Sequence, residues 1–84
     1  MKPVRFVRHA RRRMIQRDIT QEEVEEILRR PQRIESSLKG RQNAFGLTPK
    51  GLIRVTFRET LEEVIVITTV RQRSAGGADR EDRV

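Results

Sequence analysis

The sequence predicts an α+β fold in which two N-terminal helices pack on an antiparallel sheet, in the order β-α-α-β-β-β-β. Two observations lead to this prediction: a capped helical segment ends at Pro31, and the apolar residues after Pro31 recur with a period of two. With 84 residues, of which 35% are hydrophobic, folding can remove only about 60–65% of the unfolded chain's surface. The core must therefore be one layer between the helices and the sheet.

The first predicted elements are a short strand and a helix. Residues 4–7 favour β-structure, and from about His9 to Arg17 the apolar residues Ala10, Met14 and Ile15 have helical spacing. Asp18 should end this helix, because aspartate tolerates the left-handed backbone that a helix C-terminus often needs.

The second helix carries the clearest start and stop signals in the chain. Thr20 and Glu23 have the spacing of a capping box, and Pro31 ends the segment. Two ion pairs are expected on its surface, Glu25 with Arg29 and Glu26 with Arg30.

Four strands should follow. Residues 33–38 and 41–47 read as a weak hairpin around the turn Lys39-Gly40, and residues 49–51 form a second turn. Ile53, Val55 and Phe57 alternate with polar residues, which indicates one apolar and one cationic sheet face. Residues 64–70 are apolar or β-branched on both faces and should form a central strand. We expect residues 1–71 to be a single domain and residues 72–84 to be a disordered tail.

The composition excludes several kinds of site. The chain has no Cys and one His, so a disulfide framework, a cysteine zinc site and a thiol nucleophile are ruled out. We expect no metal and no cofactor. Because no apolar run is long enough to span a bilayer and the basic start lacks the apolar region of a secretory signal, a cytosolic location is expected.

Charge is strongly segregated along the chain. The formal net charge is +7; every charged residue in 1–17 is basic, and every charged residue in 18–28 is acidic. A basic surface favours polyanions such as nucleic acid, although it can also serve solubility alone. A helix-turn-helix is disfavoured, because the acids of the second helix would be repelled by DNA phosphates.

The candidate catalytic residues are His9 and Arg13, which share a helix face because they are four residues apart. Histidine can act as acid or base near neutral pH, and arginine can hold a phosphate through two hydrogen bonds. Arg12 lies beside them as a nucleic-acid contact. A structural alternative stays open, in which His9 caps the helix or bonds a sheet carbonyl and Arg13 pairs with a glutamate of the second helix.

The other candidate nucleic-acid contacts are Arg54, Arg58 and Arg71. Arg54 and Arg58 share a sheet face by their spacing, and Arg71 at the end of the last strand could join them. Such a set could hold phosphates, or it could be the solvated face of an exposed sheet. Lys39 and Arg41, beside the Gly40 turn, give a weaker signal.

Residues 8–19 read Arg8-His9-Ala10-x-x-Arg13-Met14-x-x-Arg17-Asp18-Ile19. This segment resembles the pattern K/R-H-A-x-x-R-M-x-x-R-G-I of the bacterial domain-of-unknown-function family forty-two fifty-eight, with Asp18 in place of the usual Gly. Residues 66–70 look like its closing V-I-T-V segment. The family is similar in layout to the RelE, ParE and BrnT toxins, which implies a RelE-like fold, an acidic antitoxin-like partner and, less directly, ribonuclease activity.

These observations lead to two expected functions. The first is a toxin-like protein of a toxin–antitoxin pair that acts on RNA or the translation machinery, with metal-independent ribonuclease activity as the candidate chemistry. The alternative is a non-catalytic module that binds nucleic acid or an acidic protein.

Overall fold

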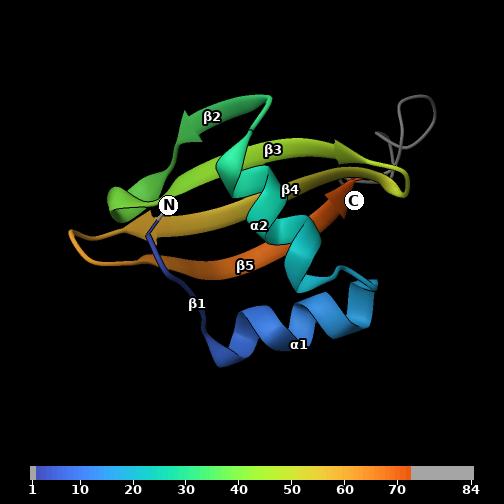
Figure 1. Cartoon of the computed structure of the whole chain (residues 1–84), viewed down its shortest axis with the longest axis horizontal. Coiled ribbons are helices and arrows are strands. Elements are labelled where there is room, and N and C mark those ends of the chain that lie inside the picture. The colour runs from blue at the N-terminus through green and yellow to red at the C-terminus, as the bar shows by residue number, and fades with distance from the viewer. Residues whose placement is uncertain (1, 73–84) are drawn as a thin grey trace.

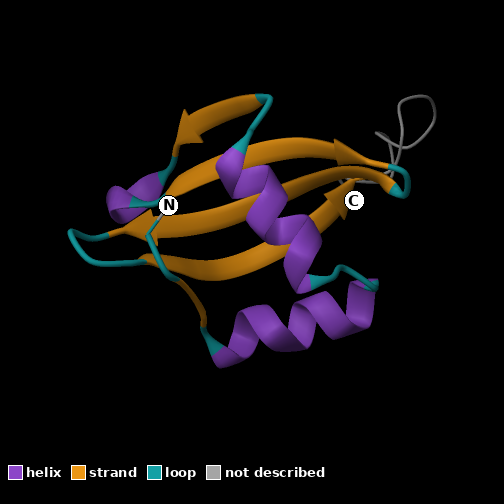
Figure 2. Ribbon diagram, viewed as in Figure 1, coloured by secondary structure: helices purple, strands orange, loops and turns teal. Residues whose placement is uncertain are grey.

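A computed structural model describes residues 2–72 as two helices on one five-stranded sheet (Figure 1; Figure 2). In chain order the elements are β1 (Val4–Phe6), α1 (Arg8–Arg17), α2 (Gln21–Arg29), β2 (Arg33–Ser36), the 3₁₀ turn η1 (Leu38–Gly40), β3 (Gln42–Thr48), β4 (Gly51–Glu59) and β5 (Val64–Gln72). The predicted class and element order are confirmed. Of the predicted tail only Gln72 is described, and it belongs to β5; the rest of the tail lies outside the described residues.

The strand order is β1-β5-β4-β3-β2, and the sheet is mixed rather than antiparallel throughout. The strands from β2 to β5 form antiparallel neighbours as predicted, but β1 pairs parallel with β5, with Val4 opposite Val64. A strand of three residues has too little alternation to specify its partner or its direction from sequence.

Both helix boundaries follow the predicted capping residues. Asp18 adopts the left-handed conformation (φ 55°, ψ 49°) and ends α1. The Thr20 hydroxyl accepts from the Glu23 amide at 3.0 Å, and the Glu23 carboxylate accepts from the Thr20 amide at 2.9 Å, so the capping box is complete. The turn between Asp18 and Thr20 therefore fixes the direction of α2 relative to α1.

The ion pairs on α2 differ from the prediction. Glu26 contacts both Arg29, at 2.9 Å, and Arg30, at 3.8 Å. Glu25 does not pair with Arg29, because its carboxylate accepts a hydrogen bond from Gln21 one turn earlier.

The core lies between the helices and one face of the sheet. Ala10 and Met14 of α1 and Val24 and Ile27 of α2 pack against the buried alternate residues of β4, which are Ile53, Val55 and Phe57. The expected apolar stripe on α1 is narrower than predicted, because Ile15 is 82% exposed. Its neighbour Met14 already faces the core, and successive helix residues point about 100° apart.

Neither helix in the part of the chain that the structure describes is long and apolar enough to cross a membrane.

Candidate nucleic-acid interface

The arginines of α1 form the largest cluster of uncompensated positive charge in residues 2–72. We call this set the α1 arginine surface; it consists of Arg8, Arg11, Arg12, Arg13 and Arg17. No acidic residue lies in the helix, and no described acidic side chain forms an ion pair with any of these arginines. Their charges are therefore available to an external anion.

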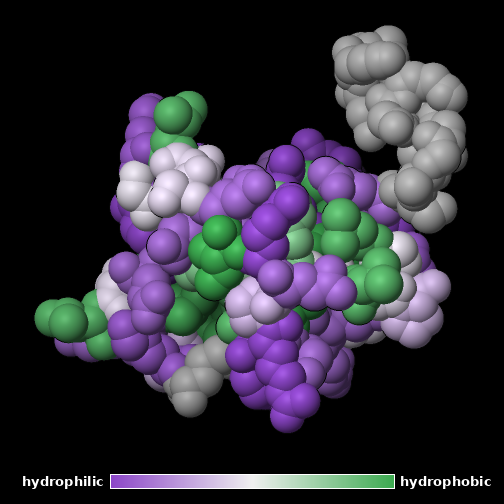
Figure 3. Space-filling view, turned by 90° about the horizontal axis from the view of Figure 1, so that it is seen from above, coloured by the Kyte–Doolittle hydropathy of each residue, from purple (hydrophilic) through white to green (hydrophobic). Residues whose placement is uncertain are grey.

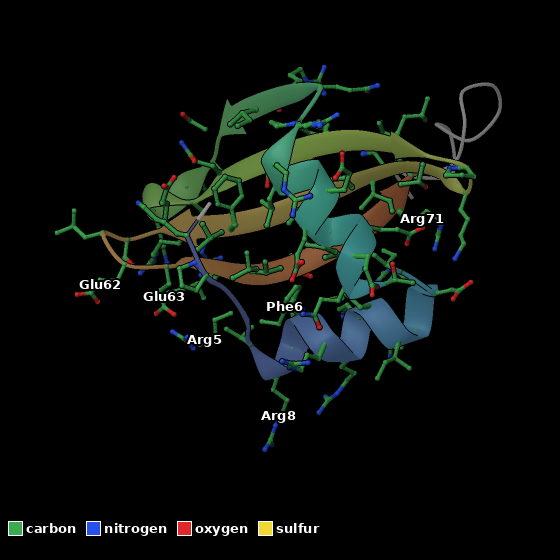
Figure 4. All side chains as sticks on the ribbon, in the orientation of Figure 1. Arg5, Phe6, Arg8, Glu62, Glu63 and Arg71 are labelled. Carbon is green, nitrogen blue, oxygen red and sulfur yellow. The ribbon has the colours of Figure 1, made fainter. Side chains whose placement is uncertain are left out.

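The helix presents these arginines because only two of its residues are fully buried. Ala10 and Met14 face the sheet, so the remaining sides of α1 lie in or beside solvent. Arg8 projects away from the sheet at the start of the helix (Figure 4). Arg11 lies over the Phe6 ring, with its guanidinium carbon 5.5 Å from the ring centroid, which orients the side chain without neutralising it.

His9 and Arg13 lie on one flank of α1, and neither makes the contacts of the structural alternative. The residue that caps α1 is Val7, and no side chain caps the helix start. Arg13 donates to the Gln16 side chain at 3.1 Å, on its own helix, rather than to a glutamate of α2. His9 is exposed. Within residues 2–72 the pair is thus free of the contacts that would make it structural.

Arg54 and Arg58 lie on the face of the sheet opposite the helices. Both alternate with the buried residues of β4 and flank Thr56, whose hydroxyl donates to the Asn43 side chain at 2.6 Å. Arg58 donates to the Lys39 carbonyl at 3.4 Å, and the buried Nε of Arg54 has no hydrogen-bond partner among the described residues. The two arginines share a face as predicted, and that face is not the face on which α1 packs.

Arg71 does not join them. Its guanidinium donates to the carbonyls of Arg17, Asp18 and Lys50, at 2.7 Å for Asp18 and 3.3 Å for Lys50. Figure 4 shows it at the end of β5, beside the turn between β3 and β4. Arg71 therefore ties the C-terminal end of α1 to the sheet, where a cation also suits the helix dipole.

A β-bulge explains why Arg71 is on the helix side. Thr56 is opposite Thr68, yet the next residue of β4, Phe57, is opposite Val66. The extra residue shifts the alternation of β5, so Arg71 comes opposite Ile53 and shares its face. Simple alternation from Val64 and Val66 would have placed Arg71 on the opposite face.

The sequence reasoning missed an aromatic contact on the open face. Phe45 lies opposite both Arg54 and Arg33, and the Arg33 guanidinium carbon is 4.3 Å from the centroid of its ring. One signal was present: Ala44 and Gly46 on either side are small, which suits a face approached closely by a helix and leaves Phe45 for the other face.

Of the eleven described cations outside α1, six are in ion pairs. Lys2 pairs with Glu59 at 2.8 Å, and Lys50 pairs with Asp18 at 3.1 Å. Arg5 forms an ion pair with Glu63 and donates a hydrogen bond to its carboxylate (Figure 4). The hydrogen bond and the negative charge of Glu63 raise the pKa of Arg5 above its ordinary value. In residues 2–72 no group of His, Asp or Glu side chains is arranged to hold a metal ion.

Comparison with known proteins identifies a family and gives no function. Neither a curated protein nor a solved structure matches the chain. A family model described as Domain of unknown function (DUF4258) matches residues 6–71, which run from the last residue of β1 almost to the end of β5. The chain therefore belongs to the DUF4258 family.

Proposed function

We propose that this protein binds RNA through the α1 arginine surface and is the toxin-like member of a toxin–antitoxin pair. The observation that supports RNA binding is that α1 carries no acid and that its arginines are in no ion pair with the described acids. A helix with several free guanidinium groups can contact successive phosphates of one strand, and binding then gains from release of counterions. An RNA target would place this action in the cytosol.

The proposed partner is a small acidic protein of the antitoxin type. It would neutralise the same arginines that contact RNA, so that partner and RNA compete for one surface. The resemblance in layout that we infer between the family and the RelE, ParE and BrnT toxins motivates this partner.

Metal-independent RNA cleavage is the second candidate function, and the placement of His9 and Arg13 favours it. The imidazole could exchange a proton with the attacking or leaving oxygen, and Arg13 could stabilise the charge on the phosphorane between them. Cleavage needs both a base and an acid, and His9 can supply one of these at a time. Binding is therefore the function that the geometry supports best.

The test of binding compares two variants with equal net charge. In the first, Arg8, Arg12 and Arg13 are changed to Gln. In the control, three arginines that are each paired with a glutamate are changed to Gln; these are Arg5, Arg29 and Arg30. Fluorescence anisotropy with a single-stranded RNA should show a loss of affinity of about 10-fold or more for the first variant and a much smaller loss for the control. Equal losses would mean that only net charge matters.

The test of cleavage uses expression in a bacterium. If His9 and Arg13 form a catalytic pair, H9A and R13A should each abolish growth arrest and RNA cleavage while the melting temperature stays within the range of a surface change. Growth arrest that persists in H9A would contradict a catalytic role for His9 and leave RNA binding as the function.

A further inference from the structure

Strand β2 forms an open edge of the sheet. It is last in the strand order, its only strand partner among the described residues is β3, and all of its residues are exposed. Ile34, in the middle of the strand, is 49% exposed. Figure 3 looks onto this side of the molecule and shows hydrophobic surface between hydrophilic side chains. A regular edge with a central apolar residue is a template for pairing with another strand.

The backbone of Ile34 is directed toward this open side. The Ser37 amide donates to the Arg41 carbonyl at 2.8 Å, in the register that pairs Ser36 with Gln42. Hydrogen-bonded pairs occur at every second residue of an antiparallel ladder, so Arg33 and Glu35 direct their backbone groups to β3. The N–H and C=O of Ile34 therefore face outward.

We propose that two copies of this protein pair antiparallel through β2, with Ile34 of one copy opposite Ile34 of the other. In this register the two central residues exchange both backbone hydrogen bonds across the two-fold axis. Arg33 then lies opposite Glu35 of the second copy, and Glu35 lies opposite Arg33. These flanking pairs are of the non-hydrogen-bonded type, in which side chains approach most closely.

The charges select this register over the neighbouring one. A shift that centres the pairing on Glu35 would still let the outward backbone groups of Ile34 and Ser36 pair, but it would place two glutamates directly opposite each other. Within one copy Arg33 and Glu35 are already on the same strand face, 3.2 Å apart. Each strand therefore presents one positive and one negative side chain to a two-fold copy of itself.

The dimer would also cover apolar surface. Ile34 lies at the rim of a groove of about 350 Å³ that includes Leu28, Phe57 and Val64. The second Ile34 would pack beside the first at this rim and remove both from water. The contact between the two β2 strands is short. Because the Gln32 amide already donates to the Phe45 carbonyl, the hydrogen-bonded ladder between the two copies is limited to the residues around Ile34. We expect a weak dimer with a Kd of roughly 10 μM to 1 mM.

Pairing at β2 leaves the α1 arginine surface free. Helix α1 packs against β5, which lies near the opposite edge of the sheet from β2 (Figure 1). A dimer would carry two arginine helices at its far ends, and an RNA long enough to reach both would bind more tightly than to one copy.

The test uses two charge reversals that complement each other. R33E makes this strand face wholly acidic, and E35R makes it wholly basic, so each variant alone should repel itself and dimerise at least about 10-fold more weakly. Mixed together, the two variants present opposite charges at both flanking positions and should form a heterodimer. Sedimentation equilibrium from about 10 μM to about 1 mM measures the association of the wild type, of each variant and of the mixture. R5E is the matched control, because it also breaks an exposed arginine–glutamate pair on an edge strand.

Any of the following results would overturn the proposal. The wild-type protein stays monomeric over the whole concentration range. The wild-type dimer is weakened by neither single variant. The mixture of R33E and E35R associates no better than each variant alone. A dimer that R5E weakens as much as R33E does would place the contact elsewhere.

Discussion

Arginine side chains in residues 2–72 lie in different environments, and Arg12, Arg54 and Arg71 illustrate three of them. Arg12 extends from α1 into solvent, Arg54 is half-buried on the open sheet face, and Arg71 is bonded to three backbone carbonyls. The sequence shows only that each residue is an arginine. Whether it binds a ligand or holds two elements together depends on the acceptors within its reach.

Removal of the Arg71 side chain should cost stability and leave RNA affinity unchanged. R71A leaves the half-buried carbonyl of Arg17 without its side-chain donor, whereas the exposed Asp18 carbonyl still accepts from Lys50, so we expect a loss of about 1–3 kcal/mol in the free energy of unfolding. Urea denaturation measures it. R12A is the reciprocal control: it should weaken RNA binding and change stability by less than about 0.5 kcal/mol. If R71A is as stable as the wild type but binds RNA more weakly, Arg71 contacts phosphates rather than stabilising the fold.

The packing of α2 on the sheet depends on Gly46 in β3. A Cβ at this position would come within 2.5 Å of Ile27 Cγ1, which is too close for two carbon atoms, and Ile27 is itself buried. G46A should therefore destabilise the protein by about 1–3 kcal/mol, although alanine is otherwise the better strand residue.

A double-mutant cycle identifies the clash as the cause. I27A removes both γ carbons of Ile27, so G46A should cost less in the I27A background than alone, with a coupling of at least about 0.5 kcal/mol. Thermal or urea unfolding of the four proteins gives the coupling. Strictly additive losses would show that Gly46 serves the backbone rather than the approach of the helix.

At this scale the sequence predicts helices better than strand neighbours. The capping box, the left-handed Asp18 and the stop at Pro31 are signals carried by residues close together in the chain, and all three are confirmed. The parallel pairing of β1 joins segments 60 residues apart, since Val4 is opposite Val64, and the bulge in β5 depends on its register with β4. A short alternating pattern carries neither kind of information. The same bulge separates Arg71 from Arg54 and Arg58. The sequence therefore placed His9, Arg12 and Arg13 together on α1, but it did not predict that Arg71 lies on the other sheet face from Arg54 and Arg58.

Within residues 2–72, positive charge outside ion pairs is concentrated on one helix. The net charge is +7, yet Lys2, Arg5, Arg29 and Lys50 are paired with carboxylates. The excess is concentrated on α1 and, to a lesser extent, on the open sheet face. In the proposed RNA complex, the acids of α2 would repel the polyanion from that helix and so favour its alignment along α1.

This arrangement predicts the salt dependence of RNA binding. If α1 and its surroundings neutralise about four to six phosphates of a single strand, log K should fall with log salt with a slope of about −3 to −4. The variant with Arg8, Arg12 and Arg13 changed to Gln loses three of these contacts, so its slope should be shallower by about 2. Anisotropy titrations across a salt series measure both slopes. If the variant binds more weakly but keeps the wild-type slope, its arginines shape the surface without contacting phosphates, and the RNA must lie on another part of the molecule.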